Sequence, residues 1–107
     1  MGAKLSFRDM SNGQLQAYIR RLAQDSLRVV ITEHAQCRMS SRSVTDWEVY
    51  ECLRKGVIQR PPSFDRKTGC LKCRMEHFGT VRNLAVVVAL DDEDPDVIVV
   101  TVMTRTR

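Results

Sequence analysis

The sequence predicts an α+β fold in one domain, with N-terminal helices packed on a three- to four-stranded antiparallel β-meander. Three observations lead to this prediction. Apolar residues recur at helical spacing in the first half of the chain, at Leu15, Ile19 and Leu22 and again after Thr45. Residues 70–78 instead alternate between apolar and polar side chains, which is typical of a half-buried strand. Helices that precede the strands, rather than alternating with them, define the α+β class.

Length and composition narrow the class of protein further. A chain of 107 residues corresponds to a single domain, 1–107, and 43% hydrophobic with 28% charged residues excludes intrinsic disorder. The sequence contains no apolar run of membrane-spanning length and no signal-peptide pattern, so we expect a cytoplasmic protein with no membrane partner. Four cysteines are too few for a disulfide scaffold.

The first elements are predicted from their capping residues. A first helix is expected over residues 11–25, with Ser11 as N-cap and Gln14 three positions later to complete a capping box. Residues 28–31 follow as a short strand, and Thr32 is placed to cap a short second helix that runs to about residue 39.

The third helix, expected over residues 45–55, has the strongest local signal. Thr45 and Glu48 have the spacing of a capping box, and Gly56 is predicted to end the helix in the left-handed conformation. Three large side chains at intervals of three residues are expected to bury this helix on the sheet: Trp47, Tyr50 and Leu53.

After this helix the period changes to that of strands. Pro61 and Pro62 end a short predicted strand, and an acidic, Pro-containing turn over 91–96 is expected to join the last two strands as a hairpin. The predicted elements are, in order, strand 57–60, loop 63–69, strand 70–78, strand 81–90 and strand 97–103.

The charge of the chain is unevenly distributed. The net charge is +4, but five acids fall within residues 91–96, and outside that stretch 17 basic residues face 8 acids, a net charge of +9. Arginine outnumbers lysine by 13 to 4, and its planar guanidinium matches phosphate oxygens. A polyanion such as RNA is therefore a candidate partner, and an ordinary solvated surface is the alternative.

A sequence pattern around the second and third helices is similar to that of a known family. The segment Ile31-Thr32-Glu33-His34-Ala35, then Arg38-Met39, Arg42, Val44-Thr45 and Glu48-Val49 resembles the signature of the "domain of unknown function 4258" family. The resemblance covers roughly residues 28–104, so that residues 1–27 are expected to form an N-terminal helical extension.

That family in turn resembles the RelE/ParE-type toxins. This resemblance implies helices on a curved antiparallel sheet and a small bacterial toxin of a toxin–antitoxin pair, many of which cut messenger RNA. It also implies RNA or the ribosome as a target and a cognate antitoxin protein as a partner.

His34, Arg38 and Arg42 are the candidate catalytic residues. Their spacing of four residues places them on one helix face if the helix extends that far. In a metal-independent endoribonuclease without cofactors, the imidazole would take the proton of a ribose 2′-hydroxyl and the guanidinium groups would stabilise charge on the phosphate. In the alternative interpretation, His34 and Arg38 are structural, bonding a carbonyl group or pairing with Glu33 or Asp46.

A basic surface could bind nucleic acid beside or instead of catalysis. Five cations on the outward face of the sheet or beyond its last strand are the candidates: Lys72, Arg74, Arg82, Arg105 and Arg107. The alternative is the ordinary polar face of an antiparallel sheet. If catalysis is absent, we expect a binding protein that docks on nucleic acid, the ribosome or a host protein complex and inhibits it, or an interaction domain of unknown role.

The cysteines raise the question of a zinc site. His34, Cys37, Cys70 and Cys73 are ligands of the zinc type, but residues three apart in a strand point to opposite faces. We therefore predict no metal site and consider small buried thiols the better interpretation.

Overall fold

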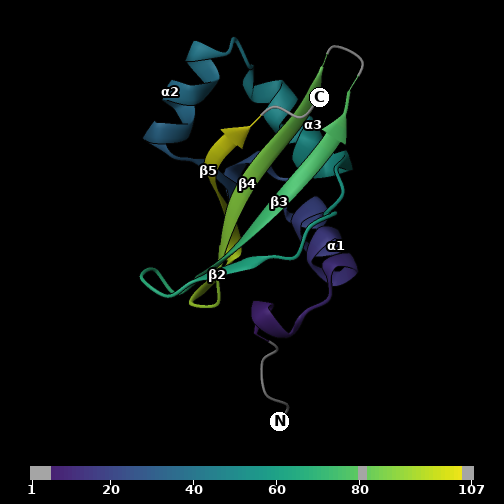
Figure 1. Ribbon diagram of the computed structural model, residues 1–107, viewed down its shortest axis with the longest axis vertical. Helices are drawn as coiled ribbons and strands as arrows, with labels where there is room; N and C mark the ends of the chain where they lie inside the picture. Colours follow the sequence, from purple (N-terminus) through teal and green to yellow (C-terminus); the bar gives the residue numbers. More distant parts are fainter. Residues whose placement is uncertain (1–5, 80–81, 105–107) are drawn as a thin grey trace.

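The computed structural model describes residues 6–79 and 82–104. Over these residues three α-helices and five strands form an α+β domain, which confirms the predicted class (Figure 1). The helices are α1 (Asn12–Leu22), α2 (Glu33–Ser41) and α3 (Asp46–Lys55). The strands are β1 (Val29–Ile31), β2 (Ser63–Asp65), β3 (Cys70–Phe78), β4 (Asn83–Asp91) and β5 (Asp94–Thr104).

The sheet differs from the predicted antiparallel meander of three or four strands. Its five strands have the order β1-β5-β4-β3-β2, and β1 pairs with β5 in the parallel direction. A parallel pair needs a long crossover connection, which here contains α2, α3 and β2 to β4. Local patterning predicts an extended segment over residues 28–31, of which Val29–Ile31 is a strand and Arg28 ends a short 3₁₀ helix, but it carries no information on a partner that lies so far along the chain.

The opposite edge of the sheet also departs from the prediction. Residues 63–69 were expected to be a loop, yet Ser63–Asp65 pairs with β3 as strand β2. Of the predicted strand 57–60, only Val57 pairs, through an isolated bridge to Glu76. Proline at 61 and 62 separates these two short pieces and prevents a longer edge strand.

All three N-terminal caps are confirmed. The hydroxyl groups of Ser11 and Thr45 accept from the backbone N–H three residues on, in full capping boxes, and Thr32 accepts from the N–H of Ala35. The prediction for Gly56 is wrong, because its φ of −73° and ψ of 172° are extended rather than left-handed. Glycine is needed there for space, since a Cβ atom would overlap the carbonyl oxygen of Cys52.

The core lies between the helices and one face of the sheet. In Figure 1, α1 and α3 lie behind the sheet and α2 lies beside β5. The helix side chains at Leu15, Ile19 and Leu53 are fully buried, together with Ile98 and Val100 of β5. Residues of α1 therefore belong to the same core as the family-like segment.

Trp47 is exposed, contrary to the prediction that it buries α3. Its relative accessibility is 62%, whereas Val49, Cys52 and Leu53 are fully buried. At 100° per residue, these three positions lie on one stripe of the helix. Trp47 lies two residues before Val49 and therefore points about 160° away from it. Because three residues make less than one full turn of an α-helix, side chains at intervals of three residues move progressively away from the buried face.

The acidic turn is shorter than the predicted 91–96, because both flanking strands extend into it. Asp91 pairs with Asp94, which leaves Asp92 and Glu93 in the turn. The Asp92 carboxylate accepts from the hydroxyl group of Ser6 at 2.7 Å and from the backbone N–H of Phe7 at 2.9 Å. In the described residues, no helix has the length and apolarity needed to cross a membrane.

Candidate functional site

The exposed face of α2 carries two of the three predicted catalytic residues. Thr32 caps the helix, so His34 lies in its first turn and Arg38 one turn later on the same face. Both side chains are exposed, and within the described residues neither makes a hydrogen bond or an ion pair. The alternative structural role predicted such contacts, so the α2 surface leaves both side chains free for an external partner.

Arg42 differs from these two residues. It is the C-cap of α2, and its guanidinium donates to the backbone carbonyl of Met103 at 2.8 Å. That bond attaches the end of α2 to β5, so Arg42 positions the helix and its charge is already engaged with the protein.

The predicted nucleic-acid-binding cations are paired with acids where the structure describes them. Lys72 lies 3.5 Å from a carboxylate oxygen of Asp65, and Arg74 lies 3.7 Å from Glu76. The Nε atom of Arg74 and the Oε2 atom of Glu76 are both buried without a hydrogen bond, so their attraction is the main compensation for burying them. The face of the sheet is therefore not a free basic surface.

Arg82 is held by several groups at once. Its Nε atom lies 2.9 Å from Glu48, and its terminal nitrogens donate to the carbonyls of Arg42 at 3.0 Å and Ser43 at 3.2 Å. It thereby joins the α2–α3 connection, α3 and the start of β4. Arg105 and Arg107 lie outside the described residues.

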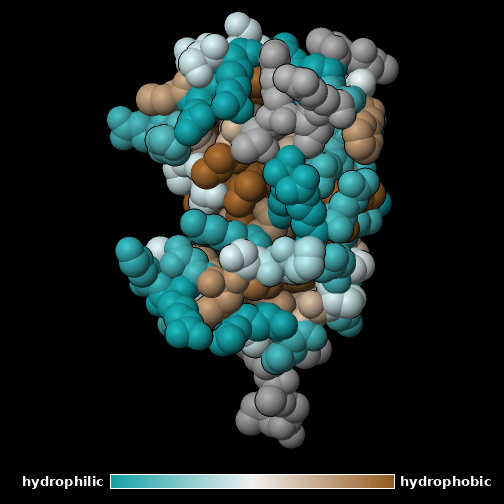
Figure 2. Space-filling model, in the orientation of Figure 1, coloured by the Kyte–Doolittle hydropathy of each residue, from teal (hydrophilic) through white to brown (hydrophobic). Residues whose placement is uncertain are grey.

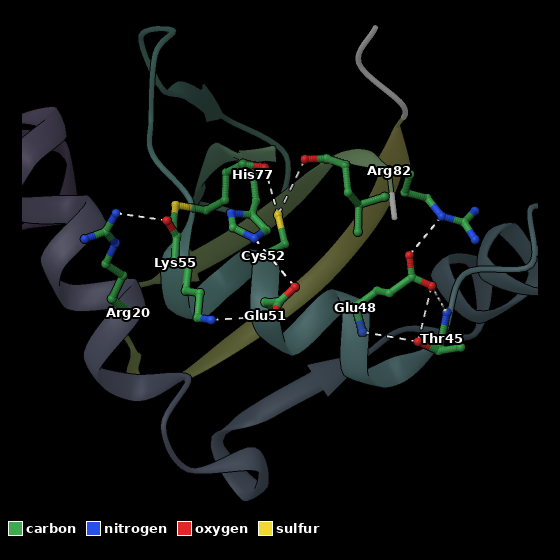
Figure 3. Close-up of polar contacts among 10 residues, drawn as sticks. Arg20, Thr45, Glu48, Glu51, Cys52, Lys55, His77 and Arg82 are labelled. Atoms are coloured by element: carbon green, nitrogen blue, oxygen red, sulfur yellow. Dashed lines mark hydrogen bonds and ion pairs between the residues drawn. The ribbon is translucent and has the colours of Figure 1, made fainter. Parts of the chain in front are cut away.

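A polar network between α3 and β3 was not recognised in the sequence (Figure 3). A Glu51 carboxylate oxygen lies 3.6 Å from Nε2 of His77, and its other oxygen lies 3.6 Å from Nζ of Lys55. Figure 3 shows Glu51 between these two side chains, with Arg20 of α1 donating to the Lys55 carbonyl at 3.0 Å. The β-alternation that buries Met75 places His77 on the same face, and that was the signal available for finding it.

Cys52 lies on the buried side of this network. Its thiol contacts the carbonyl oxygen of Met75 at 3.3 Å, and burial raises the pKa of the thiol to about 12. Beside the network, Trp47, Glu51, His77 and Arg82 line a hollow of about 20 Å³, which is room for about one water. A space of this size does not admit a substrate, so the network mainly joins α3 to the sheet.

The residues of the zinc alternative are separated in the structure. Cys73 is buried on the inner face of β3, Cys70 lies on the opposite face, and Cys37 is exposed on α2. In the ranges 6–79 and 82–104, the structure has no group of three or more His, Cys, Asp or Glu that could hold a metal ion. The predicted strand geometry of residues 70–73 is thus confirmed.

Fold and surface together define a small α+β protein whose helix beside the sheet carries an exposed histidine and arginine, both without a polar partner in the described part of the chain. A family model described as "Domain of unknown function (DUF4258)" matches residues 31–104. The chain belongs to this family, and the match begins immediately before α2 and ends with β5. No curated protein and no solved structure matches the chain.

Proposed function

We propose that this protein binds RNA through the exposed face of α2 and cleaves it without a metal ion. His34 is the general base and Arg38 the phosphate contact. The observation that carries the proposal is that these two residues are exposed, one helical turn apart, and without partners in the described part of the chain. The excess of basic residues outside the acidic hairpin supports a polyanionic ligand.

The chemistry needs few groups. The imidazole of His34 takes the proton from a ribose 2′-hydroxyl, and the 2′-oxygen forms a bond to the adjacent phosphorus atom. The bond from phosphorus to the 5′-oxygen breaks, that oxygen takes a proton from water, and a 2′,3′-cyclic phosphate remains. Arg38 stabilises the charge that develops on the phosphate oxygens, while Arg42 holds the end of α2 against β5.

The biological role in this proposal is that of a small bacterial toxin. Cleavage of messenger RNA, free or on the ribosome, would stop growth, and a cognate antitoxin protein would hold the activity in check in the cytoplasm. The comparison with RelE/ParE-type toxins rests on the resemblance of the sequence, and a layer of helices on a mainly antiparallel sheet is only the same general class of fold. Because folds are shared among many functions, the site residues carry the argument and the fold adds little.

Incubation of the purified protein with labelled single-stranded RNA in EDTA tests the proposal. Cleavage should survive EDTA, should end in a cyclic phosphate, and should fail on an oligonucleotide with 2′-deoxy sugars. The His34→Ala variant should cleave about 100-fold more slowly with an unchanged melting temperature, because the side chain is exposed and unpaired. A fully active His34→Ala protein would refute the catalytic role of this residue.

Two matched variants serve as controls. Arg66→Ala removes the same charge as Arg38→Ala from an exposed turn before β3, so only the latter should weaken cleavage. His77→Ala should lower stability, since it leaves Glu51 without one of its partners, but the remaining folded protein should keep its activity.

A second candidate function is non-catalytic binding to RNA, the ribosome or a host protein complex. One observation favours it: His34 has no carboxylate or carbonyl partner in the described residues to fix its tautomer, as catalytic histidines usually have. A salt-sensitive shift in RNA mobility without cleavage, weakened by Arg38→Ala but not by Arg66→Ala, would support this function instead.

A further inference from the structure

The face of the sheet that carries no helix contains a cavity of about 300 Å³. It lies where the turn between β2 and β3 comes together with the β4–β5 hairpin, at the lower left of Figure 1. Its floor is apolar, formed by Ala89, Val97 and Val99. Figure 2 shows apolar side chains on this face bordered by hydrophilic ones. A volume of this size is at the lower end of the range found for ligand sites.

The rim of this cavity is acidic. Three carboxylates, those of Asp65, Asp91 and Asp94, face a single cation, Lys72. Lys72 lies 3.5 Å from Asp65, whose pKa is lowered by the backbone N–H of Lys67 and by Lys72. That pair is therefore mutually compensated.

Among the residues that the structure describes, the other two carboxylates have no cationic partner. Asp91 accepts only the backbone N–H of Glu93, at 2.9 Å, and Asp94 has no hydrogen bond or ion pair in the described residues. Two negative charges thus stand beside an apolar floor without a cation that compensates them in the described residues. A cationic group of a ligand would be attracted by both carboxylates.

The acidic rim disfavours two kinds of binding partner for this cavity. The phosphates of RNA would be repelled, so this cavity is distinct from the surface proposed for RNA on α2. A second copy of the chain, paired by a two-fold axis through this face, would bring like carboxylates together. The remaining occupant has apolar side chains for the floor and cations for the rim.

We propose that this groove binds an extended protein segment in which apolar residues alternate with lysine or arginine. In an extended chain, every second side chain points to the same side, so its apolar residues can lie on Ala89, Val97 and Val99. The intervening cationic side chains are long enough to turn back to Asp91 and Asp94. Charge complementarity selects the segment, and the apolar floor retains it.

Titration of the full chain with three fluorescent hexapeptides, followed by anisotropy, tests this proposal. One peptide alternates lysine and valine, the second glutamate and valine, and the third lysine and serine. Only the lysine–valine peptide should bind, with a dissociation constant below about 100 μM and at least tenfold more tightly than the others. Equal binding of the glutamate–valine peptide would mean that the groove is an unselective apolar patch. Equal binding of the lysine–serine peptide would mean that charge alone drives the binding. Either result overturns the proposal, and so does the absence of binding by all three peptides.

Charge-matched variants assign the binding to the groove. The double variant Asp91→Asn, Asp94→Asn should weaken lysine–valine binding at least tenfold, because it removes the two uncompensated charges while asparagine keeps an oxygen for the Glu93 N–H. The double variant Glu33→Gln, Asp46→Asn removes two exposed charges from α2 and α3 and should change binding less than twofold. Equal losses in both variants would overturn the assignment, as would displacement of the peptide by single-stranded RNA.

Self-association of the protein through this face is tested separately. Sedimentation should find the same mass at 10 and 200 μM, since the acidic rims repel each other. A dimer that the Val99→Lys variant abolishes would identify a second copy as the occupant and overturn the proposal.

Discussion

At the scale of single residues, burial separates the cysteines into two chemical kinds. Cys52 and Cys73 are fully buried and burial raises the pKa of each thiol to about 12, whereas Cys37 is exposed on α2. The reactive form of a cysteine is its thiolate. At pH 8, a thiol with a pKa near 12 is ionised in only about one molecule in 10⁴.

We expect native protein at pH 8 to react with a disulfide reagent quickly at Cys37, more slowly at half-buried Cys70, and not at Cys52 or Cys73 until it unfolds. Counting released chromophore with and without denaturant measures this, and Cys37→Ser should remove the fast phase alone. Four equally fast thiols in the native state would contradict the packing of α3 on β3.

At the scale of elements, capping residues could be predicted and side-chain partners could not. Ser11, Thr32 and Thr45 act on amides within three residues, so the sequence contains the whole interaction. The parallel pairing of β1 with β5 joins Val29 to Ile98, and no local pattern reports it. The same holds for Arg82, whose partners Arg42, Ser43 and Glu48 lie far along the chain.

The same distinction between local and long-range contacts applies to the residues of the candidate site. The sequence predicts that His34 and Arg38 share one helix face, because both lie within one capped helix. Arg42 was grouped with them by spacing alone, and its bond to Met103 depends on a strand that is 61 residues away. The pairing of Lys72 with Asp65 could not be anticipated without knowing that residues 63–65 form a strand.

The buried stripe of α3 gives a prediction for unfolding. Trp47→Ala should reduce the free energy of unfolding by less than about 1 kcal/mol, because the indole is exposed. Leu53→Ala, the matched change on the buried stripe, should cost about 2–5 kcal/mol. Urea unfolding followed by circular dichroism measures both. A larger loss for Trp47→Ala than for Leu53→Ala would mean that α3 packs through the opposite face.

At the scale of the whole molecule, the N-terminal end of the described chain lies against the acidic hairpin between β4 and β5. The N-terminal turn Phe7–Asp9 is held there by Asp92, which accepts from Ser6 and from the backbone N–H of Phe7. Phe7 is buried and meets the ring of Tyr18 edge-on, with the ring centres 5.0 Å apart. The acidic hairpin thus fastens the N-terminal segment to the domain.

We therefore expect Asp92→Ala to release this segment while the sheet stays folded. The variant loses two hydrogen bonds with a charged acceptor, each worth about 1–3 kcal/mol when buried and less at this exposed site. Hydrogen exchange at the amides of residues 7–10 should accelerate by about tenfold or more, with β4 and β5 unchanged, because only the local opening becomes easier. Glu93→Ala removes the neighbouring charge, whose side chain makes no hydrogen bond or ion pair in the described residues, and should leave exchange unaltered. Uniform acceleration of exchange across β4 and β5 in Asp92→Ala would instead show that Asp92 stabilises the whole domain. Equal acceleration in both variants would show that the net charge of the hairpin controls the N-terminal segment, and not the bonds from Ser6 and Phe7 to Asp92.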